Sequence, residues 1–204
     1  MIKTSEKTAD SYKSTADLLI RKFGEREKVI ESLFKAAILY GSENQEKAVD
    51  CLDELHDILR GSTAEIEIEQ YLKYLYQLAK LYEQYKEIIK AADIYVELAK
   101  EHSKFEEGEE TVKHLKDLKK FSAYLAKALF LYETGKKFDS ILKLARIYYK
   151  VFPVLQEHEH IHRELFFCYE HIINAADQTG SRYFREYYAE LDRKLKGEDM
   201  MFPK

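Results

Sequence analysis

Residues Tyr74–His102, YLYQLAKLYEQYKEIIKAADIYVELAKEH, decide the fold. Their apolar side chains recur at the spacing of one helix face, first over Leu75–Tyr82 and again over Ala91–Ala99. The join near Tyr85 and Lys86 contains neither glycine nor proline, so we expect a short turn between two antiparallel helices. Two helices with such narrow apolar stripes cannot form a core alone. They must stack on similar pairs.

The helical pattern extends over the whole chain, and no segment alternates as a β-strand does. The seven glycines fall where an apolar periodicity stops, which is typical of helix C-terminal caps. Ser62 and Glu65 have capping-box spacing, and Pro153 is expected to end a helix. The predicted helices cover residues 4–23, 25–41, 44–60, 63–84, 86–104, 108–134, 136–151, 154–179 and 181–196.

The order Leu-Ala-x-x-Tyr in Leu78–Tyr82, followed by Ala-x-x-x-Tyr-x-x-Leu in Ala91–Leu98, resembles the tetratricopeptide repeat. The resemblance implies an all-α fold of antiparallel helix pairs, about nine helices stacked as a right-handed α-solenoid. It implies one domain over 1–204, with a capping helix at 1–24, stacked pairs over 25–196 and a flexible tail at 197–204. Ala79 and Ala91 would touch within the central pair. The tyrosines taken as equivalent are Tyr40, Tyr82, Tyr132 and Tyr169.

The segment Leu118–Leu155, LKKFSAYLAKALFLYETGKKFDSILKLARIYYKVFPVL, resembles the C-terminal half of the soluble attachment proteins (SNAP family). Those proteins join SNARE bundles to a disassembly ATPase. The likeness includes Lys120–Ala123, Lys127–Leu129 and the Phe-Pro pair that ends at Pro153. The chain is shorter than that family, and its end, MMFPK, lacks the family's leucine-containing tail. The resemblance therefore implies a repeat architecture and binding of helical bundles, without the ATPase role.

The sixth and seventh predicted helices should pack less tightly than a standard pair. Leu129 and Ile141 stand where the repeat consensus places Gly and Ala. Because bulkier side chains at a helix–helix contact hold the backbones apart, we expect this pair to splay.

Composition narrows the class of protein. The net charge of −4 selects neither nucleic acid nor membrane. The sequence shows no secretory signal and no apolar run of the ~18 residues that a membrane span needs. Cys51 and Cys168 are far apart and lack CxxC spacing, so they are interpreted as buried structural thiols in a reducing compartment. We expect a cytoplasmic protein without a cofactor.

Little in the sequence indicates catalysis. It contains no glycine-rich phosphate loop and no GxSxG. The run QEHEHIHRE places His158, Glu159 and His162 at spacings used by metal sites on one helix. The favoured interpretation is an exposed polar start of a helix. The alternative is a metal- or small-ligand-binding helical bundle centred on these three residues.

We therefore expect a non-enzymatic scaffold or adaptor that binds a protein or peptide. In tetratricopeptide arrays the first helix of each pair lines a concave groove, at positions offset from the packing stripe. Such a groove would take an amphipathic helix or an extended peptide. The groove residues predicted here are Phe34, Ile38, Lys73, Tyr76, Lys80, Phe130 and Glu133.

A basic strip is a second candidate surface. Residues 113–150 carry ten Lys or Arg against three Asp or Glu. The strip could simply be a solvated helix face, or it could attract an acidic amphipathic helix or, in peripheral contact, an anionic lipid surface. Nucleic acid is not expected, because the aromatic side chains are needed for the core. The strip residues are Lys113, Lys116, Lys120, Lys127, Lys136 and Lys143.

Overall fold

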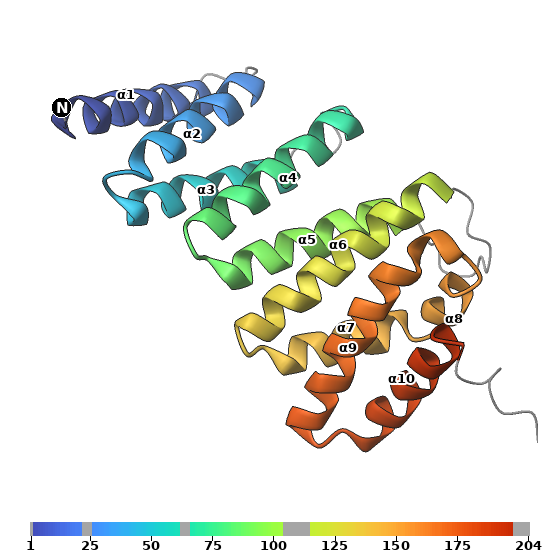
Figure 1. The fold of residues 1–204 in the computed structure, drawn as a ribbon. Coiled ribbons are helices and arrows are strands. Elements are labelled where there is room, and N and C mark those ends of the chain that lie inside the picture. The colour runs from blue at the N-terminus through green and yellow to red at the C-terminus, as the bar shows by residue number, and fades with distance from the viewer. Residues whose placement is uncertain (1, 22–25, 62–65, 104–114, 198–204) are drawn as a thin grey trace, which may run out of the picture. The chain divides into compact units, whose positions relative to one another are not determined.

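The computed structural model describes residues 2–21, 26–61, 66–103 and 115–197 (Figure 1). All regular elements within these ranges are helical, ten α-helices and one 3₁₀-helix, so the expected all-α class is confirmed. The chain divides into two compact units, Met1–Glu87 and Ile88–Lys204, and each is described by itself. The single domain and the right-handed solenoid over 1–204 stay predictions. The capping box at 62–65, the helix start at 108–114 and the tail at 198–204 lie outside the described residues.

The first unit consists of α1 (Ile2–Arg21), α2 (Arg26–Tyr40), α3 (Gln45–Arg60) and α4 (Ile68–Gln84). Helix α2 packs against α1 and α3, and α3 packs against α4. Leu33, Leu52 and Leu75, one from each of α2, α3 and α4, are fully buried. Asn44 caps α3, because its side-chain oxygen accepts a hydrogen bond from the Lys47 N–H at 3.1 Å. Each helix therefore buries one apolar stripe, as the periodicity predicts.

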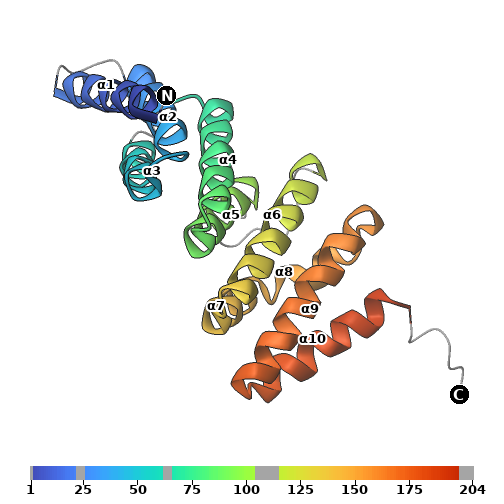
Figure 2. The same ribbon diagram turned by 60° about the vertical axis from the view of Figure 1, so that its left-hand side comes forward.

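The second unit contains seven helical elements within residues 88–103 and 115–197, and α6 packs between α5 and α9. Helices α9 and α10 pair closely, side by side in orange and red in both views (Figures 1 and 2). Helix α6 packs less extensively on α7 than α2 does on α3, which agrees with the splay expected from Leu129 and Ile141. The elements are α5 (Ile88–Ser103), α6 (Leu115–Thr134), α7 (Phe138–Tyr148), α8 (Val151–Leu155), the 3₁₀-helix η1 (Glu159–Ile161), α9 (His162–Thr179) and α10 (Arg182–Leu195).

A tyrosine near the end of three helices donates a hydrogen bond to an aspartate on the preceding helix. The pairs are Tyr40 with Asp10 at 2.5 Å, Tyr82 with Asp53 at 2.7 Å, and Tyr132 with Asp93. Burial, and then the bond to the carboxylate, raise the pKa of all three tyrosines, so the phenols stay protonated donors. Asp10 lies on α1, so α1 supplies the hydrogen-bond acceptor for Tyr40, as α3 supplies it for Tyr82. We call each such pair a Tyr–Asp contact.

The prediction that Tyr169 is equivalent to these three tyrosines is wrong. The turn after α6 is closed by the Lys137 N–H bonded to the Tyr132 carbonyl, and the turn after α9 by the Ser181 N–H bonded to the Ala176 carbonyl. Ala176 is therefore the residue equivalent to Tyr132. Tyr169 lies about two helical turns earlier and is fully buried. Tyr169 fits the sequence pattern because it lies on the buried, apolar stripe of its helix.

Three predicted helices have wrong boundaries. The fourth begins at Ile68 rather than residue 63, because Glu67 before it has an extended backbone (φ −57°, ψ 134°). The helix predicted at 136–151 ends at Tyr148, and the one predicted at 154–179 is divided into α8, η1 and α9. Pro153 does not end a helix. It lies in the first turn of α8, where its missing N–H has no intrahelical partner.

The turn between α4 and α5 is short, as expected, and its geometry recurs between α6 and α7. Lys86 and Lys136 adopt left-handed backbone angles (φ 62° and 56°) at equivalent positions. Glycine was expected at such caps, but of the described glycines only Gly180 and Gly197 have positive φ. Ala79 and Ala91 are both fully buried, but they belong to different units, so their contact stays a prediction.

Candidate interaction surfaces

Most predicted groove residues of the first unit are on its surface. Ile38 is 56% exposed and Tyr76 is 42% exposed. Lys73 and Lys80 are exposed on α4, and the Lys80 ammonium lies 5.7 Å from the centroid of the Tyr76 ring. Phe34 is the exception. It is buried, with its ring 5.9 Å from that of Tyr74, so it belongs to the core between α2 and α4 rather than to a groove.

The predicted groove residue Glu133 has a different role from the one expected. Its two carboxylate oxygens are hydrogen-bonded to His171 Nδ1 and Asn174 Nδ2, both on α9. Because a carboxylate only accepts, the imidazole nitrogen facing it must carry a proton. Glu133 therefore links the end of α6 to α9 and is only partly accessible to a partner. His171 and Asn174 were not identified from the sequence.

Phe130 belongs to an exposed surface formed by α6 and α9. Phe130 is 48% exposed and Phe167 is 40% exposed. A cation accompanies each ring: Lys127 Nζ is 5.5 Å from the Phe130 centroid, and the Arg163 guanidinium carbon is 6.0 Å from that of Phe167. We call these four residues the α6/α9 face. Phe167 and Arg163 were missed, although their i,i+4 spacing on one helix could have revealed them.

The predicted basic strip is distributed over three elements. Lys120 and Lys127 lie on α6, Lys136 lies in the following turn, and Lys143 lies on α7. Lys120, Lys136 and Lys143 are exposed, while Lys127 is half-buried. Lys116 falls within α6, and Lys113 lies outside the described residues. That these lysines form one docking strip stays a prediction.

The His158 cluster does not lie on one helix. His158 precedes η1 with an extended backbone (φ −111°), whereas His162 begins α9, so Glu159 and His162 do not share an α-helical face. The His162 Nε2 atom lies 2.7 Å from the Gln156 carbonyl oxygen and is engaged there. Over the described ranges, no group of three or more His, Cys, Asp or Glu residues is placed to hold a metal ion.

Both cysteines are free and buried, as interpreted from the sequence. Burial raises the pKa of the Cys51 thiol to about 11 and also raises that of Cys168. Thiols with raised pKa values are poor nucleophiles near neutral pH. Within the part of the chain that the structure describes, no helix has the length and apolarity needed to cross a membrane.

No family model matches the chain, and no curated protein matches it. Among solved structures, the chain is similar to a Podosopora anserina protein described as a kinesin light chain with nearly identical TPR-like repeats. The identity is 13% and the TM-score 0.49, covering 97% of this chain and 90% of that chain. It is also similar to BtubC (BKLC) from P. vanneervenii, with 13% identity, a TM-score of 0.35, and coverage of 100% and 92%. The fold is tetratricopeptide-like on the evidence of its own helix pairs and turns.

Proposed function

We propose that the chain is a non-enzymatic protein-interaction module whose α6/α9 face binds an acidic amphipathic helix. The observation that carries this proposal is the pairing of Phe130 and Phe167, both exposed, with the cations Lys127 and Arg163. Exposed apolar rings beside charged groups are typical of protein-binding surfaces. The rings would contact the apolar side of a partner helix, and the cations would face its carboxylates.

The α6/α9 face is held in place before any partner arrives. Glu133 links α6 to α9 through His171 and Asn174, and the His171 ring lies 5.9 Å from that of Phe130. A surface whose two helices are already fixed loses less conformational entropy on binding. This pre-organisation favours a rigid, helical partner over one that must reshape the site.

Two further features support a helical, acidic partner. The segment that resembles the soluble attachment proteins, Leu118–Leu155, includes most of α6, and those proteins bind helical bundles. In the first unit, Ile38 and Tyr76 are exposed, and Lys73 and Lys80 lie near Tyr76 on α4. We propose that they form a second contact of the same kind, and that Lys120, Lys136 and Lys143 attract the partner over longer range.

Photo-crosslinking tests the α6/α9 face. A photoreactive phenylalanine analogue is placed at Phe130, and the matched control places it at Leu18, which is 56% exposed on α1. Partners captured from native lysate are identified by mass spectrometry. We expect capture from position 130 and not from position 18, with the crosslinked partner peptide acidic and amphipathic. Phe130→Ala combined with Phe167→Ala should abolish capture of that partner in a pull-down. Undiminished capture by this double variant would contradict the proposal.

Salt dependence tests the long-range attraction. Reversal of Lys120, Lys136 and Lys143 to Glu should slow association with the same partner and flatten its dependence on salt, because exposed charges act over about 8 Å at physiological ionic strength. Stability should change by no more than about 0.5 kcal/mol. Association that keeps its full salt dependence would exclude these lysines as the source of the attraction.

A further inference from the structure

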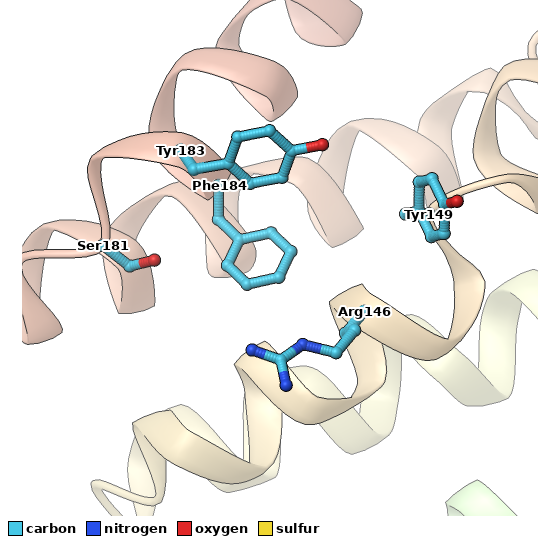
Figure 3. Close-up of a pocket in the computed structure, with 5 residues that line it drawn as sticks. All are labelled: Arg146, Tyr149, Ser181, Tyr183 and Phe184. Atoms are coloured by element: carbon cyan, nitrogen blue, oxygen red, sulfur yellow. The ribbon is translucent and has the colours of Figure 1, made fainter.

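A hollow of about 370 Å³ lies between α7 and α10, and it involves none of the four residues of the α6/α9 face (Figure 3). Arg146 and Tyr149 line it from the α7 side, and Tyr183 and Phe184 line it from α10, with Ser181 just before that helix. In Figure 3 the Phe184 ring points towards Arg146, and the guanidinium carbon lies 5.9 Å from the ring centroid. We call this site the α7/α10 hollow.

The aromatic wall of the hollow is exposed but held in position. Tyr183 is 67% exposed and Tyr149 is 38% exposed. The Tyr187 hydroxyl donates a hydrogen bond to the Tyr149 carbonyl at 2.8 Å. The Tyr187 ring stacks on Tyr183, with centroids 6.3 Å apart and planes 9° from parallel. Tyr183 is thus supported by a neighbour that is itself bound to the end of α7. Rigid exposed tyrosines lose little entropy when a ligand covers them.

The positive charge at the hollow lies on one side only. Arg182 and Arg185, beside the hollow on α10, pair with Glu186 and Asp177, with N–O distances of 2.6 Å. Arg146 has no acidic partner among the described residues, and the same holds for Lys143 and Lys150 on the same stretch. The Lys150 ammonium instead lies 5.8 Å from the Tyr149 ring centroid. A ligand in the hollow therefore meets cations on the α7 side and aromatic rings on the α10 side.

We propose that the α7/α10 hollow is a second docking site, which binds a short acidic peptide segment of a partner protein. A carboxylate of the peptide would pair with Arg146, whose planar guanidinium suits two-point binding of a carboxylate. A neighbouring apolar side chain would lie against Tyr149 and Tyr183. Charge complementarity points to this occupant, because the cations are few and adjacent to an apolar concavity.

Membranes and nucleic acids fit the hollow less well. Lipid surfaces attract clusters of four to eight cations, and a nucleic-acid backbone is followed by an extended basic groove. At the hollow, the arginines of α10 are neutralised by their own acidic partners, which leaves the α7 cations alone. A peptide needs only one or two charge pairs and one inserted side chain, which is what the hollow offers.

Peptide selection on the full chain provides the probe. A phage-displayed library of short random peptides is selected on the wild-type protein, with counter-selection on Arg146→Glu. We expect peptides enriched in Asp or Glu beside an apolar residue. Their affinity, measured with fluorescently labelled synthetic copies, should fall by roughly tenfold or more in Arg146→Glu and in Tyr183→Ala.

Matched variants separate this site from other effects. Lys7→Glu makes the same charge change at an exposed residue of α1, and should leave affinity unchanged. Phe130→Ala with Phe167→Ala should also leave it unchanged, so failure of the α6/α9 face and failure of the hollow are distinguishable. Tyr183 is mostly exposed, so its variant should fold, and circular dichroism checks this. Selected peptides without acidic enrichment, equal binding to Arg146→Glu, or Arg146-dependent binding to anionic vesicles or single-stranded DNA but not to peptide would overturn the proposal.

Discussion

The two units solve the same packing problem with different side chains. In the first unit, α2 and α4 each make a Tyr–Asp contact with the preceding helix, at Tyr40 and at Tyr82. In the second unit Tyr132 makes this contact, whereas Ala176 occupies the next equivalent position and has no hydroxyl group to donate. There the inserted helix α8 supplies Phe152, whose ring packs against two buried tyrosines. The comparison indicates that a missing polar contact can coexist with a larger aromatic core.

Truncation of Phe152 should have the largest effect. Its ring is 1% exposed and packs edge-on against Tyr169 and Tyr188, with centroids 5.4 Å and 5.5 Å away. Phe152→Ala should lower the free energy of unfolding by about 3–5 kcal/mol. Denaturant titration measures the loss, and hydrogen exchange should locate it in α9 and α10. Equal acceleration of exchange in α2 and α3 would show that the two units unfold together.

Adding a methyl group at a turn glycine should have the second largest effect, and the loss of stability should differ between the two units. A Cβ on Gly41 would lie 2.1 Å from the hydroxyl oxygen of Tyr85, a buried ring anchored by a 2.9 Å bond to the Ala37 carbonyl. A Cβ on Gly135 would meet the Ile89 Cδ1 atom at 2.3 Å, which can rotate away. Gly41→Ala should therefore cost about 1–3 kcal/mol, and Gly135→Ala less than about 1 kcal/mol. Thermal denaturation of both variants checks the order, and the reverse order would contradict it.

Removing single hydroxyl groups should distinguish true Tyr–Asp contacts from Tyr169. Tyr82→Phe and Tyr132→Phe should each cost about 1 kcal/mol, since each removes a bond to a carboxylate. The Tyr169 hydroxyl lies 3.5 Å from its acceptor, the Phe152 carbonyl, at the limit of a hydrogen bond. Tyr169→Phe is therefore the control and should cost less. Equal losses in denaturant titration for all three variants would indicate that Tyr169 is equivalent to the other tyrosines.

The smallest expected effect concerns pH. The hydrogen bond from Tyr40, with help from Lys47, lowers the pKa of the exposed Asp10 carboxyl. A group whose pKa is lower in the folded state stabilises the fold above its unfolded value, about 4, and the contribution is lost as pH falls below it. Melting temperatures measured down through pH 4 should therefore fall slightly less in Tyr40→Phe than in the wild type. A steeper fall in the variant would mean that Asp10 is not stabilised by this bond.

The sequence was sufficient to predict the fold class and most helix ends. Apolar periodicity and glycine positions indicate where a helix forms and ends, and both depend on residues that are close in the chain. Gly41, Gly61 and Gly180 follow helices at or near the predicted positions. The predictions failed where packing between helices determines the helix boundary or the turn conformation. The sequence predicts that Pro153 ends a helix, yet Pro153 lies in the first turn of α8, which buries Phe152 and Leu155. Lys86 and Lys136 hold left-handed positions that no local rule assigns to lysine.

The candidate surfaces were predictable only in part, for a related reason. Helix periodicity separates buried from exposed faces, and it correctly placed Ile38, Tyr76 and Phe130 on the surface. It could not show that Phe34 packs on Tyr74, or that Glu133 is bound by His171, because those neighbours come from other helices. The α7/α10 hollow depends on two elements more than thirty residues apart, and the spacing within either one does not reveal it.

The Tyr–Asp contacts also suggest how such an array could lengthen or shorten in evolution. Each contact joins a helix to the one that follows it: α1 to α2, α3 to α4 and α5 to α6. A duplicated or deleted block made of such a pair would carry both donor and acceptor with it. The boundary between the two compact units, Glu87 to Ile88, lies between the block α3–α4 and the block α5–α6. The repeat pattern in the sequence instead groups α4 with α5 as one pair. The heritable module would then be offset by one helix from the repeat seen in the sequence.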